Sequence, residues 1–436
     1  MYKYADYFAQ YGRIMQFNKN KLEPVHRWYP FVEGYSKEFI KSIVDETGKQ
    51  DLVCLEPFSG SGTTALELQN MGIKCISFEV NPLMYLVSRV KLYKHYSLGV
   101  VHKQLVKVLK DARGSNLGTV NSPFFTMYQS GGRKKWNLSL EVGVAVEKLK
   151  TAIHNIREAA YADLFLVALA SILLDVSNLY RNGKCLSYKE NWQDAHLTQE
   201  DVFKSFANKV TNDIIPDIQQ FEILPHADVE TCDNYHLLFN EDCRTAIDNY
   251  VEDDSVDLVI TSPPYLNSRD YTDTYMLELK ALGFTKNLGE IRALRQKTLR
   301  SHVQIRWSDK TNIDNTELEE TLKKLKLASK DKVWNPSIIS MVRLYFVDMQ
   351  TVFRALAKKV KQGGKVYFNV SNSAYFGVEI NTLEICSSIA EKEGFSITEI
   401  RKARYLKTSP QQKNAVSKLL EGVIVMERRA QRIEER

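Results

Sequence analysis

Five consecutive residues combine a hydroxyl group, two rigid backbone positions and an aromatic ring: Thr261, Ser262, Pro263, Pro264 and Tyr265. They follow the apolar, β-branched run 256–260, which predicts a buried strand, so the five should form the loop at its carboxyl end. Open α/β sheets bind ligands at this end. Because consecutive prolines restrict the backbone, the loop can hold a hydroxyl, a carbonyl and an aromatic face against a planar ring that bears an amino group. The alternative is an ordinary proline turn.

A second stretch with chemical potential is a tight loop between the apolar run 52–55 and a helix that should begin at Thr63. The loop contains Glu56, Phe58, Ser59, Gly60 and Gly62. Its glycines allow the backbone to approach a ligand closely, and the following helix offers unpaired N–H groups and a positive dipole end. This order favours a nucleotide-like ligand, although many glycine loops only turn the chain. No Gly-Lys-Ser/Thr sequence follows, which excludes the phosphate loop of nucleotide hydrolases.

Glu79 follows the next apolar run, 73–78. In doubly wound nucleotide-binding folds, an acidic residue about 20 residues beyond the glycine loop holds the ribose diol. The alternative for Glu79 is a solvated strand end or a helix N-cap. A third apolar run, 235–239, leads in the same way to Asp242.

The elements that must position these residues alternate between strands and helices. This alternation predicts an α/β, Rossmann-like, mostly parallel sheet with helices on both faces. Helices are expected at 36–48 and from Val342 to Val360, with Gly363 and Gly364 turning the chain into the strand 365–370. Two more strands are expected at 396–400 and 421–426.

Two long segments interrupt the alternation. Residues 96–234 are helix-rich and predict a helical insertion, while 285–307 is strongly basic and contains Arg292, Arg295, Arg300 and Arg306. A lysine run at 323–332 ends at Trp334. Basic residues beside indole rings suit phosphate contacts and base stacking, although a solvated helix face with core tryptophans fits the lysine run equally well. We divide the chain into 1–95, 96–234, 235–284, 285–340 and 341–436.

Composition narrows the class of protein. The 436 residues carry a net charge of +6, a mild excess that fits a polyanionic partner. The six cysteines form no C-x-x-C pair and no metal-ligand spacing, so we expect a cytoplasmic protein without a metal site. The amino terminus does not resemble a signal peptide, and the apolar stretch 164–174 is too short to span a bilayer. We therefore expect no membrane role.

Taken together, the motifs resemble those of the amino-group DNA methyltransferases that use S-adenosylmethionine. Glu56 through Thr64 resembles their motif I, and Ser262 through Tyr265 resembles the Ser-Pro-Pro-Tyr form of motif IV found in cytosine-N4 enzymes of restriction-modification systems. The resemblance implies that the cofactor site contains Glu56, Phe58, Ser59, Gly60, Gly62, Thr63, Glu79 and Asp242. Glu79 would accept hydrogen bonds from both ribose hydroxyls, and Asp242 would lie near the adenine amino group.

The implied reaction is methylation of the N4 amine of a cytosine flipped out of double-stranded DNA. Ser262 and the Pro263 carbonyl would hold the amine hydrogens, Pro264 would stiffen the loop, and Tyr265 would stack on the base. A cognate restriction endonuclease is the expected partner. The alternatives are adenine-N6 methylation, RNA methylation, and a catalytically silent DNA-binding component. Motif I precedes motif IV, whereas many Ser-Pro-Pro-Tyr enzymes have the reverse order, and two long segments interrupt the sheet. The target-recognition region is therefore a hypothesis, based on charge: residues 285–334 read or grip DNA, and the helical insertion assists.

Overall fold

One eight-stranded sheet forms the centre of the computed structural model, which describes residues 2–49, 51–183, 185–223, 236–329, 336–408, 412 and 414–430. The strand order is β1-β11-β12-β8-β7-β2-β3-β6. In chain order these strands are β1 (Tyr4–Asp6), β2 (Val53–Glu56), β3 (Lys74–Phe78), β6 (His236–Phe239), β7 (Val256–Thr261), β8 (Val360–Ser371), β11 (Phe395–Lys407) and β12 (Lys418–Arg428).

Strand direction confirms the predicted fold class. The five adjacent strands β6, β3, β2, β7 and β8 are parallel to one another. Strand β1 is parallel to β11, and β12 is antiparallel to both β8 and β11. The central strands are buried on both faces, which is why they have continuous apolar runs in the sequence. A parallel sheet with one reversed strand and helices on both faces is a Rossmann-like methyltransferase fold.

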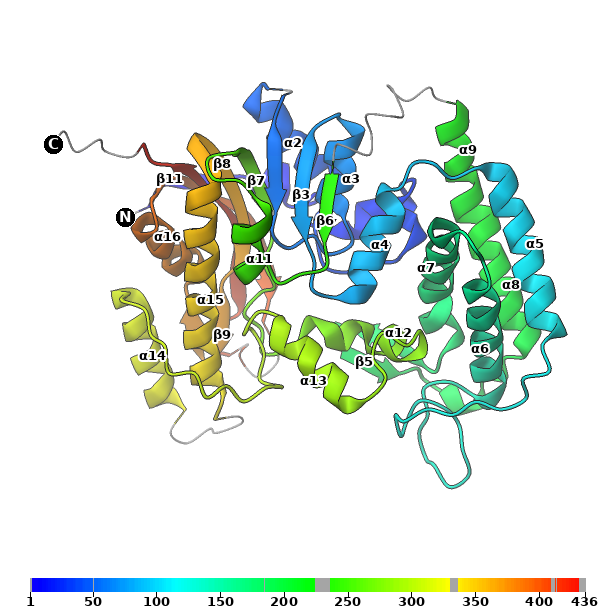
Figure 1. Cartoon of the computed structure of the whole chain (residues 1–436). Helices are drawn as coiled ribbons and strands as arrows, with labels where there is room; N and C mark the ends of the chain where they lie inside the picture. Colours follow the sequence, from blue (N-terminus) through cyan, green and yellow to red (C-terminus); the bar gives the residue numbers. More distant parts are fainter. Residues whose placement is uncertain are drawn as a thin grey trace.

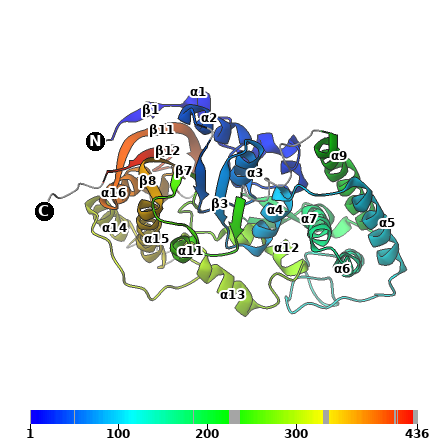
Figure 2. The same cartoon turned by 45° about the horizontal axis from the view of Figure 1, so that its top comes forward.

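Helices cover the two faces of the sheet with separate apolar cores. Figure 2 shows the sheet between these two layers. One layer contains α2 (Lys37–Thr47), α3 (Thr63–Asn70) and α4 (Pro82–Leu92); the other contains α11 (Cys243–Tyr250), α15 (Ile338–Lys359) and α16 (Thr382–Lys392). Helix α2 follows Ser36 and ends at Gly48, as predicted, because Gly48 adopts the left-handed conformation that stops a helix.

The helical insertion lies beyond α4, at one end of the molecule (Figure 1). Its elements are α5 (Leu98–Gly114), α6 (Leu140–His154), α7 (Ala159–Val176), the hairpin β4 (Leu179–Asn182) and β5 (Cys185–Tyr188), α8 (Gln199–Lys209), and α9 (Ile215–Ile223). Helix α7 is long and apolar enough to span a membrane by length and composition, and 61% of it is buried within the chain. The insertion shares one apolar core with the adjacent face of the sheet.

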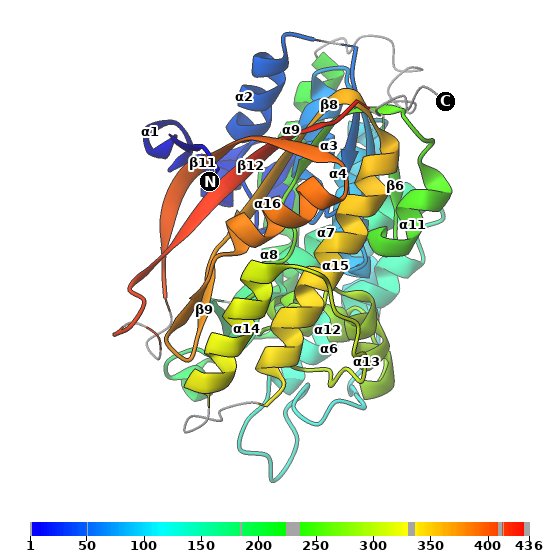
Figure 3. The same cartoon turned by 90° about the vertical axis from the view of Figure 1, so that its left-hand side faces the viewer.

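In Figure 1, the first helices of the segment after the proline loop lie below β3 and β6. This segment contains η5 (Tyr271–Tyr275), α12 (Met276–Ala281), α13 (Leu288–Lys297) and α14 (Thr316–Ala328). Figure 3 shows α14 packed on the outside of α15. Three lysines of the predicted basic run are exposed on α14, opposite its buried Leu318 and Leu325, which is the arrangement of a solvated helix face. Lys330, Lys332 and Trp334 of the lysine run, and Tyr235 of the apolar run 235–239, lie outside the described residues.

The predicted boundaries of three strands were wrong. Strands β11 and β12 run well beyond 396–400 and 421–426, because two register shifts in their pairing interrupt the alternation that would mark one long strand. Strand β8 begins at Val360, so Gly363 and Gly364 lie inside it. A Cβ atom at Gly364 would lie 2.7 Å from Val360 Cγ1, so only glycine fits this bend.

Candidate active site

A cavity of about 390 Å³ opens at the carboxyl ends of β2, β3, β6 and β7. Its size is within the range of about 300–1,000 Å³ that is common for cofactor sites. Residues from the amino-terminal segment, α13 and the far strands β8, β11 and β12 complete its wall. Ten predicted site residues line it: Phe58, Ser59, Gly60, Thr63, Glu79, Asp242, Ser262, Pro263, Pro264 and Tyr265.

The glycine loop is held from behind by α4. Ser88 Oγ donates to Gly60 O at 2.9 Å, and the buried Lys91 Nζ donates to Ser61 O at 3.1 Å. Burial lowers the pKa of Lys91 to about 7. Gly60 faces the cavity with φ +54°, whereas Gly62 does not line it; a Cβ atom at Gly62 would meet Ser88 Oγ at 2.9 Å. Gly62 therefore permits close helix packing rather than ligand approach.

Glu79 presents a fixed carboxylate to the cavity. Its oxygens accept hydrogen bonds from Gly60 N at 2.8 Å and Asn81 N at 2.7 Å. Burial raises the pKa of Glu79 to about 7. The nearby Ser59 Oγ is buried and has no hydrogen-bond partner among the described residues. An oriented carboxylate beside a free hydroxyl and a bare glycine backbone fits a ribose with its attached polar groups.

Glu56, also predicted to bind the cofactor, does not line the cavity. Its carboxylate is saturated by Phe58 N at 3.0 Å, Tyr35 Oη at 2.9 Å, Thr64 Oγ1 at 2.8 Å, and the hydroxyl of Thr261. Burial raises the pKa of Glu56 to about 7. The hydrogen bonds of Glu56 join β2, β7, α3 and the amino-terminal segment. Its role is therefore to position the glycine loop and the proline loop relative to each other.

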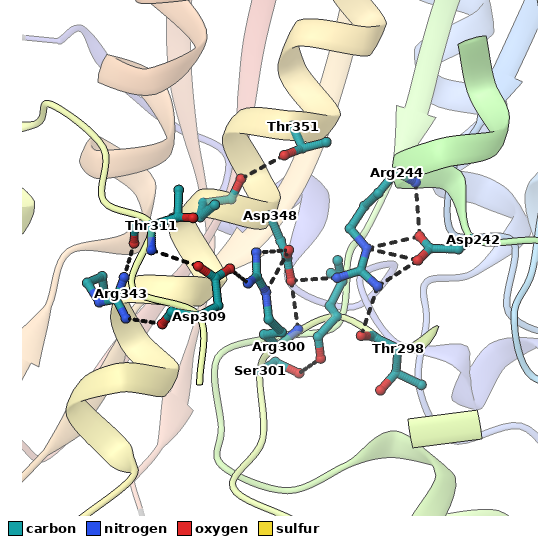
Figure 4. A network of polar contacts seen from close by, with 12 residues as sticks. Asp242, Arg244, Thr298, Arg300, Ser301, Asp309, Thr311, Arg343, Asp348 and Thr351 are labelled. Carbon is teal, nitrogen blue, oxygen red and sulfur yellow. Dashed lines mark hydrogen bonds and ion pairs between the residues drawn. The ribbon is translucent and has the colours of Figure 1, made fainter. Parts of the chain in front are cut away.

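Asp242 begins α11 and is clamped by Arg244 (Figure 4). Arg244 Nε lies 3.0 Å from both carboxylate oxygens of Asp242, and Nη2 lies 2.6 Å from Oδ2. The same Nη2 donates to Lys297 O at 3.0 Å and Thr298 O at 3.3 Å. Arg244 therefore fixes Asp242 and, at the same time, holds the carboxyl end of α13 against the cavity.

The polar network continues into the segment predicted to grip DNA (Figure 4). Asp348 of α15 accepts from Arg244 Nη1 at 3.0 Å and from Arg300 Nη2 at 2.7 Å, and Arg300 Nη1 lies 2.5 Å from Asp309 Oδ2. Arg300 is thus committed to ion pairs within the chain. A guanidinium paired on both sides has no free fork for phosphate, so these ion pairs favour a structural role for Arg300 over the predicted DNA contact.

The ion pairs of Arg295 favour a structural role in the same way. Its Nε lies 3.1 Å from Asp270 Oδ2, and its Nη2 pairs with Asp273. These bonds fasten α13 to the segment after the proline loop. Arg292 and Arg306 are exposed, so two of the four predicted arginines remain accessible to a polyanion.

The proline loop leaves β7 and turns along the cavity wall. Tyr265 N donates to Tyr271 Oη at 3.0 Å, which fixes the loop after its second proline. Ser262 Oγ lies 3.5 Å from Tyr265 Oη, so the hydroxyl and the phenol are on the same side of the loop. The prolines have no N–H to satisfy, which suits a loop whose carbonyls face a ligand.

Three site residues were missed in the sequence: Asn369 of β8, Arg404 of β11 and Glu421 of β12, all of which line the cavity. Tyr265 Oη donates to Glu421 Oε1 at 2.5 Å and accepts from Asn369 Nδ2 at 2.8 Å; Arg404 Nε pairs with the other oxygen of Glu421. Asn369 and Glu421 lie at the ends of predicted strands and could have been suspected. Arg404 lies beyond the predicted end of its strand and gave no signal.

The amino-terminal segment was also missed as part of the site. Phe31 and Tyr35 line the cavity. The rings of Phe31 and Tyr275 are nearly parallel, and their centroids are 6.1 Å apart. A Cβ atom at Gly60 would lie 3.0 Å from Phe31 Cζ. Within the described ranges, no group of three or more His, Cys, Asp or Glu side chains could hold a metal ion.

Comparison with known proteins places the chain among relatives of one type. It is 27% identical over 443 residues to the Type II methyltransferase M.BsoBI of Geobacillus stearothermophilus, with 89% of this chain and 82% of the relative covered. It is 24% identical over 425 residues to the Type II methyltransferase M.AvaI of a Nostoc strain, with the same coverage. The Type II methyltransferase M.MvaI of Kocuria varians matches at 23% identity over 58% of this chain and 55% of the relative.

These relatives support a DNA methyltransferase role and imply S-adenosylmethionine as the methyl donor. No protein-family model matches the chain. A solved structure assigned as a sarcosine dimethylglycine methyltransferase from Galdieria sulphuraria covers 90% of this chain and 85% of that chain, at 7% identity and a TM-score of 0.32.

Proposed function

We propose that this protein is a site-specific DNA methyltransferase that modifies the N4 amine of cytosine, acting in the cytoplasm as the protective enzyme of a restriction-modification system. The observation that carries the proposal is that Ser262, Pro263 and Tyr265 line the same cavity as Gly60, Glu79 and Asp242. Residues that can orient an exocyclic amine and residues that can hold a nucleoside thus line one cavity.

The cofactor half of the cavity suits S-adenosylmethionine, which when bound supplies a methyl group on a positively charged sulfur. Glu79 accepts hydrogen bonds from the ribose hydroxyls, and the Gly60 backbone leaves room for the methionine portion. Asp242, oriented by Arg244, faces the adenine amino group. Phe31 closes this half from the amino-terminal side and helps to exclude water.

The base half of the cavity prepares the amine. Its lone pair is delocalised into the base, so the nitrogen is a poor nucleophile until its hydrogens are held out of the ring plane. Ser262 Oγ and the Pro263 carbonyl accept those hydrogens, and Tyr265 packs against the base. Its phenol is tied to Glu421 and Asn369, so the ring is oriented before the base arrives. Most of the acceleration then comes from positioning and fixed dipoles.

The test is mass spectrometry of nucleosides from unmethylated genomic DNA incubated with the protein and isotopically labelled S-adenosylmethionine. We expect labelled N4-methylcytosine, reduced about 100-fold or more in Ser262→Ala, since loss of one preorganised hydrogen-bonding group in an active site commonly has this effect. Ser396→Ala, on the exposed part of β11, is the control and should retain full activity.

Other outcomes would replace the proposal. Labelled N6-methyladenine would assign the enzyme to adenine, and label found only in RNA would change the substrate. Absence of label together with failure to bind S-adenosylmethionine would identify a catalytically silent DNA-binding component.

A further inference from the structure

Arg404 is a cation at the base end of the cavity whose donors are only partly used. Its Nε pairs with Glu421, and its terminal nitrogens Nη1 and Nη2 have no hydrogen-bond partner among the described residues. Its side chain is about one quarter exposed, whereas that of Glu421 is 2% exposed. The buried carboxylate of Glu421 thus anchors the Nε edge of the guanidinium, and the two terminal nitrogens remain available to a ligand.

The strand pairing places Arg404 there. Lys402 is opposite Gly422 and Arg404 is opposite Glu421, so Ala403 is an extra residue in β11. Such a bulge re-aims the side chains that follow it. A Cβ atom at Gly422 would lie 2.7 Å from Arg401 O, so glycine is required for the strands to approach at this point.

Arg404 is connected to the proposed amine-binding group through a short chain of contacts. Glu421 accepts from Tyr265 Oη, which accepts from Asn369 Nδ2, and this nitrogen also lies 3.4 Å from Ser262 Oγ. All five residues line the cavity. Ser262, which would hold the amine, and Arg404 are thus linked through Asn369, Tyr265 and Glu421 in one cavity, so a base held by Ser262 would have Arg404 in the same space.

We propose that the two terminal nitrogens of Arg404 donate to N3 and O2 of the flipped cytosine and thereby select cytosine over adenine. The inference rests on the proposed function. Beside its exocyclic amine, cytosine presents two adjacent acceptors, N3 and O2, whereas adenine presents one acceptor, N1, and then a C–H group. A guanidinium fork matches two acceptors and leaves one donor unpaired against adenine.

The first experiment compares Arg404→Lys with Arg401→Lys. Lysine keeps the positive charge opposite Glu421 but loses the planar fork, so the fold is retained while the two-point contact is lost. We expect N4-methylcytosine formation to fall roughly 5- to 150-fold, the value of one bidentate base contact, with unchanged affinity for S-adenosylmethionine. Arg401 is the control because Glu46, Glu399 and Tyr11 occupy its donors away from the cavity.

A second experiment distinguishes a direct contact between Arg404 and the base from an indirect effect of Arg404 on the position of Tyr265. Once the methylated sequence is mapped, the target cytosine is replaced by the C-nucleoside of 2-aminopyridine, which keeps the amine and the ring nitrogen but has hydrogen in place of O2. Wild type should methylate this duplex roughly 5- to 150-fold more slowly than the natural one. Arg404→Lys should discriminate between the two duplexes much less, because the contact is already absent.

Equal penalties for the analogue in wild type and Arg404→Lys would overturn the inference, as would an undiminished rate in Arg404→Lys on natural DNA. Either result would leave the proposed function intact if wild type still forms N4-methylcytosine. Label on adenine in the wild-type reaction would instead overturn the proposed function and this inference with it.

Discussion

At the scale of single residues, the main feature is a set of carboxylates with different tasks in one small region. Glu56 is saturated by four donors and joins structural elements, Glu79 faces the cavity on two backbone amides, and Glu421 anchors Tyr265 and Arg404. In the sequence, Glu56, Glu79 and Glu421 look alike, since each is an acidic residue at the end of a strand. Their hydrogen-bond partners decide which of them remains available to a ligand.

Glu79 makes cofactor binding dependent on pH. Only the ionised carboxylate accepts hydrogen bonds from both ribose hydroxyls, and burial raises its pKa to about 7. The ionised fraction therefore falls as pH drops through 7, and we expect affinity for S-adenosylmethionine to weaken about tenfold per pH unit below that value. Isothermal titration calorimetry between pH 5 and 8, roughly the range spanning this pKa, measures the effect.

The matched variant for this prediction is Glu79→Gln, which cannot ionise. It should bind more weakly at pH 8 and lose the pH dependence that wild type shows; Glu56→Gln should keep that dependence. If the wild-type and Glu79→Gln profiles run parallel, the titrating group is in the ligand or elsewhere in the chain.

At the scale of elements, the glycine loop depends on how closely α4 packs behind it. Gly62 and Gly72 both have positive φ, of 80° and 72°, but a Cβ atom at Gly62 meets Ser88 at 2.9 Å while one at Gly72 meets nothing within 4 Å. Alanine at either position costs about 1–2 kcal/mol of backbone strain. We expect Gly62→Ala to lose more stability than Gly72→Ala and also to weaken cofactor binding.

Urea unfolding and calorimetric titration of both glycine variants measure these effects. Gly72→Ala should bind S-adenosylmethionine like wild type, because its turn is remote from the cavity. Equal losses of stability with unchanged affinity in both variants would mean that the contact between Gly62 and α4 does not shape the site.

The basic segment contains structural and accessible arginines. Arg300 lies in the network of Figure 4, whereas Arg292 and Arg306 are exposed. Arg300→Ala leaves Asp348 without one of its two cationic partners, so we expect a loss of about 3–5 kcal/mol in the free energy of unfolding. Arg292→Ala and Arg306→Ala should leave stability unchanged and each reduce the salt dependence of DNA binding by about 0.9, the slope for one lost phosphate contact. Fluorescence anisotropy across salt concentrations measures this slope; an unchanged slope in both would remove α13 and its following loop from the DNA interface.

At the scale of the whole molecule, the helical insertion and the sheet form one packed body. Arg181 of β4 lies 2.6 Å from Glu278 of α12, and both side chains are largely buried. A single apolar core also runs from α2 and α4 into α7 and α8. The insertion therefore supports the wall behind the cavity instead of forming an independent module.

Calorimetry of Glu278→Gln tests whether the helical insertion and the sheet unfold as one cooperative unit. Loss of the buried pair should cost about 3–5 kcal/mol and shift one cooperative unfolding transition as a whole. Lys41→Gln, which removes the exposed pair with Asp45, should cost less than about 1 kcal/mol. Two separate transitions, only one of them shifted, would show that the insertion unfolds independently of the sheet.

The sequence by itself determined the fold class and two loops of the candidate site. Buried parallel strands must be apolar throughout, and a loop at their carboxyl ends needs special residues, so 52–62 and 256–265 were legible without a structure. Periodicity also predicted the helix at 36–48, which is α2, and the helical insertion. Both signals are local, since they depend on neighbouring residues in the chain.

Only the tertiary structure decided which charged side chains face the cavity and which face each other. In the sequence, Arg292, Arg295 and Arg300 all lie in the same basic segment and cannot be told apart. In the structure, Arg295 and Arg300 have carboxylate partners, one of them as distant in the chain as Asp348. Arg404 reaches the site through a bulge in a strand whose pairing partner lies 17 residues further on. Ion pairing and register are set by contacts between distant segments, and a single sequence carries no local sign of them.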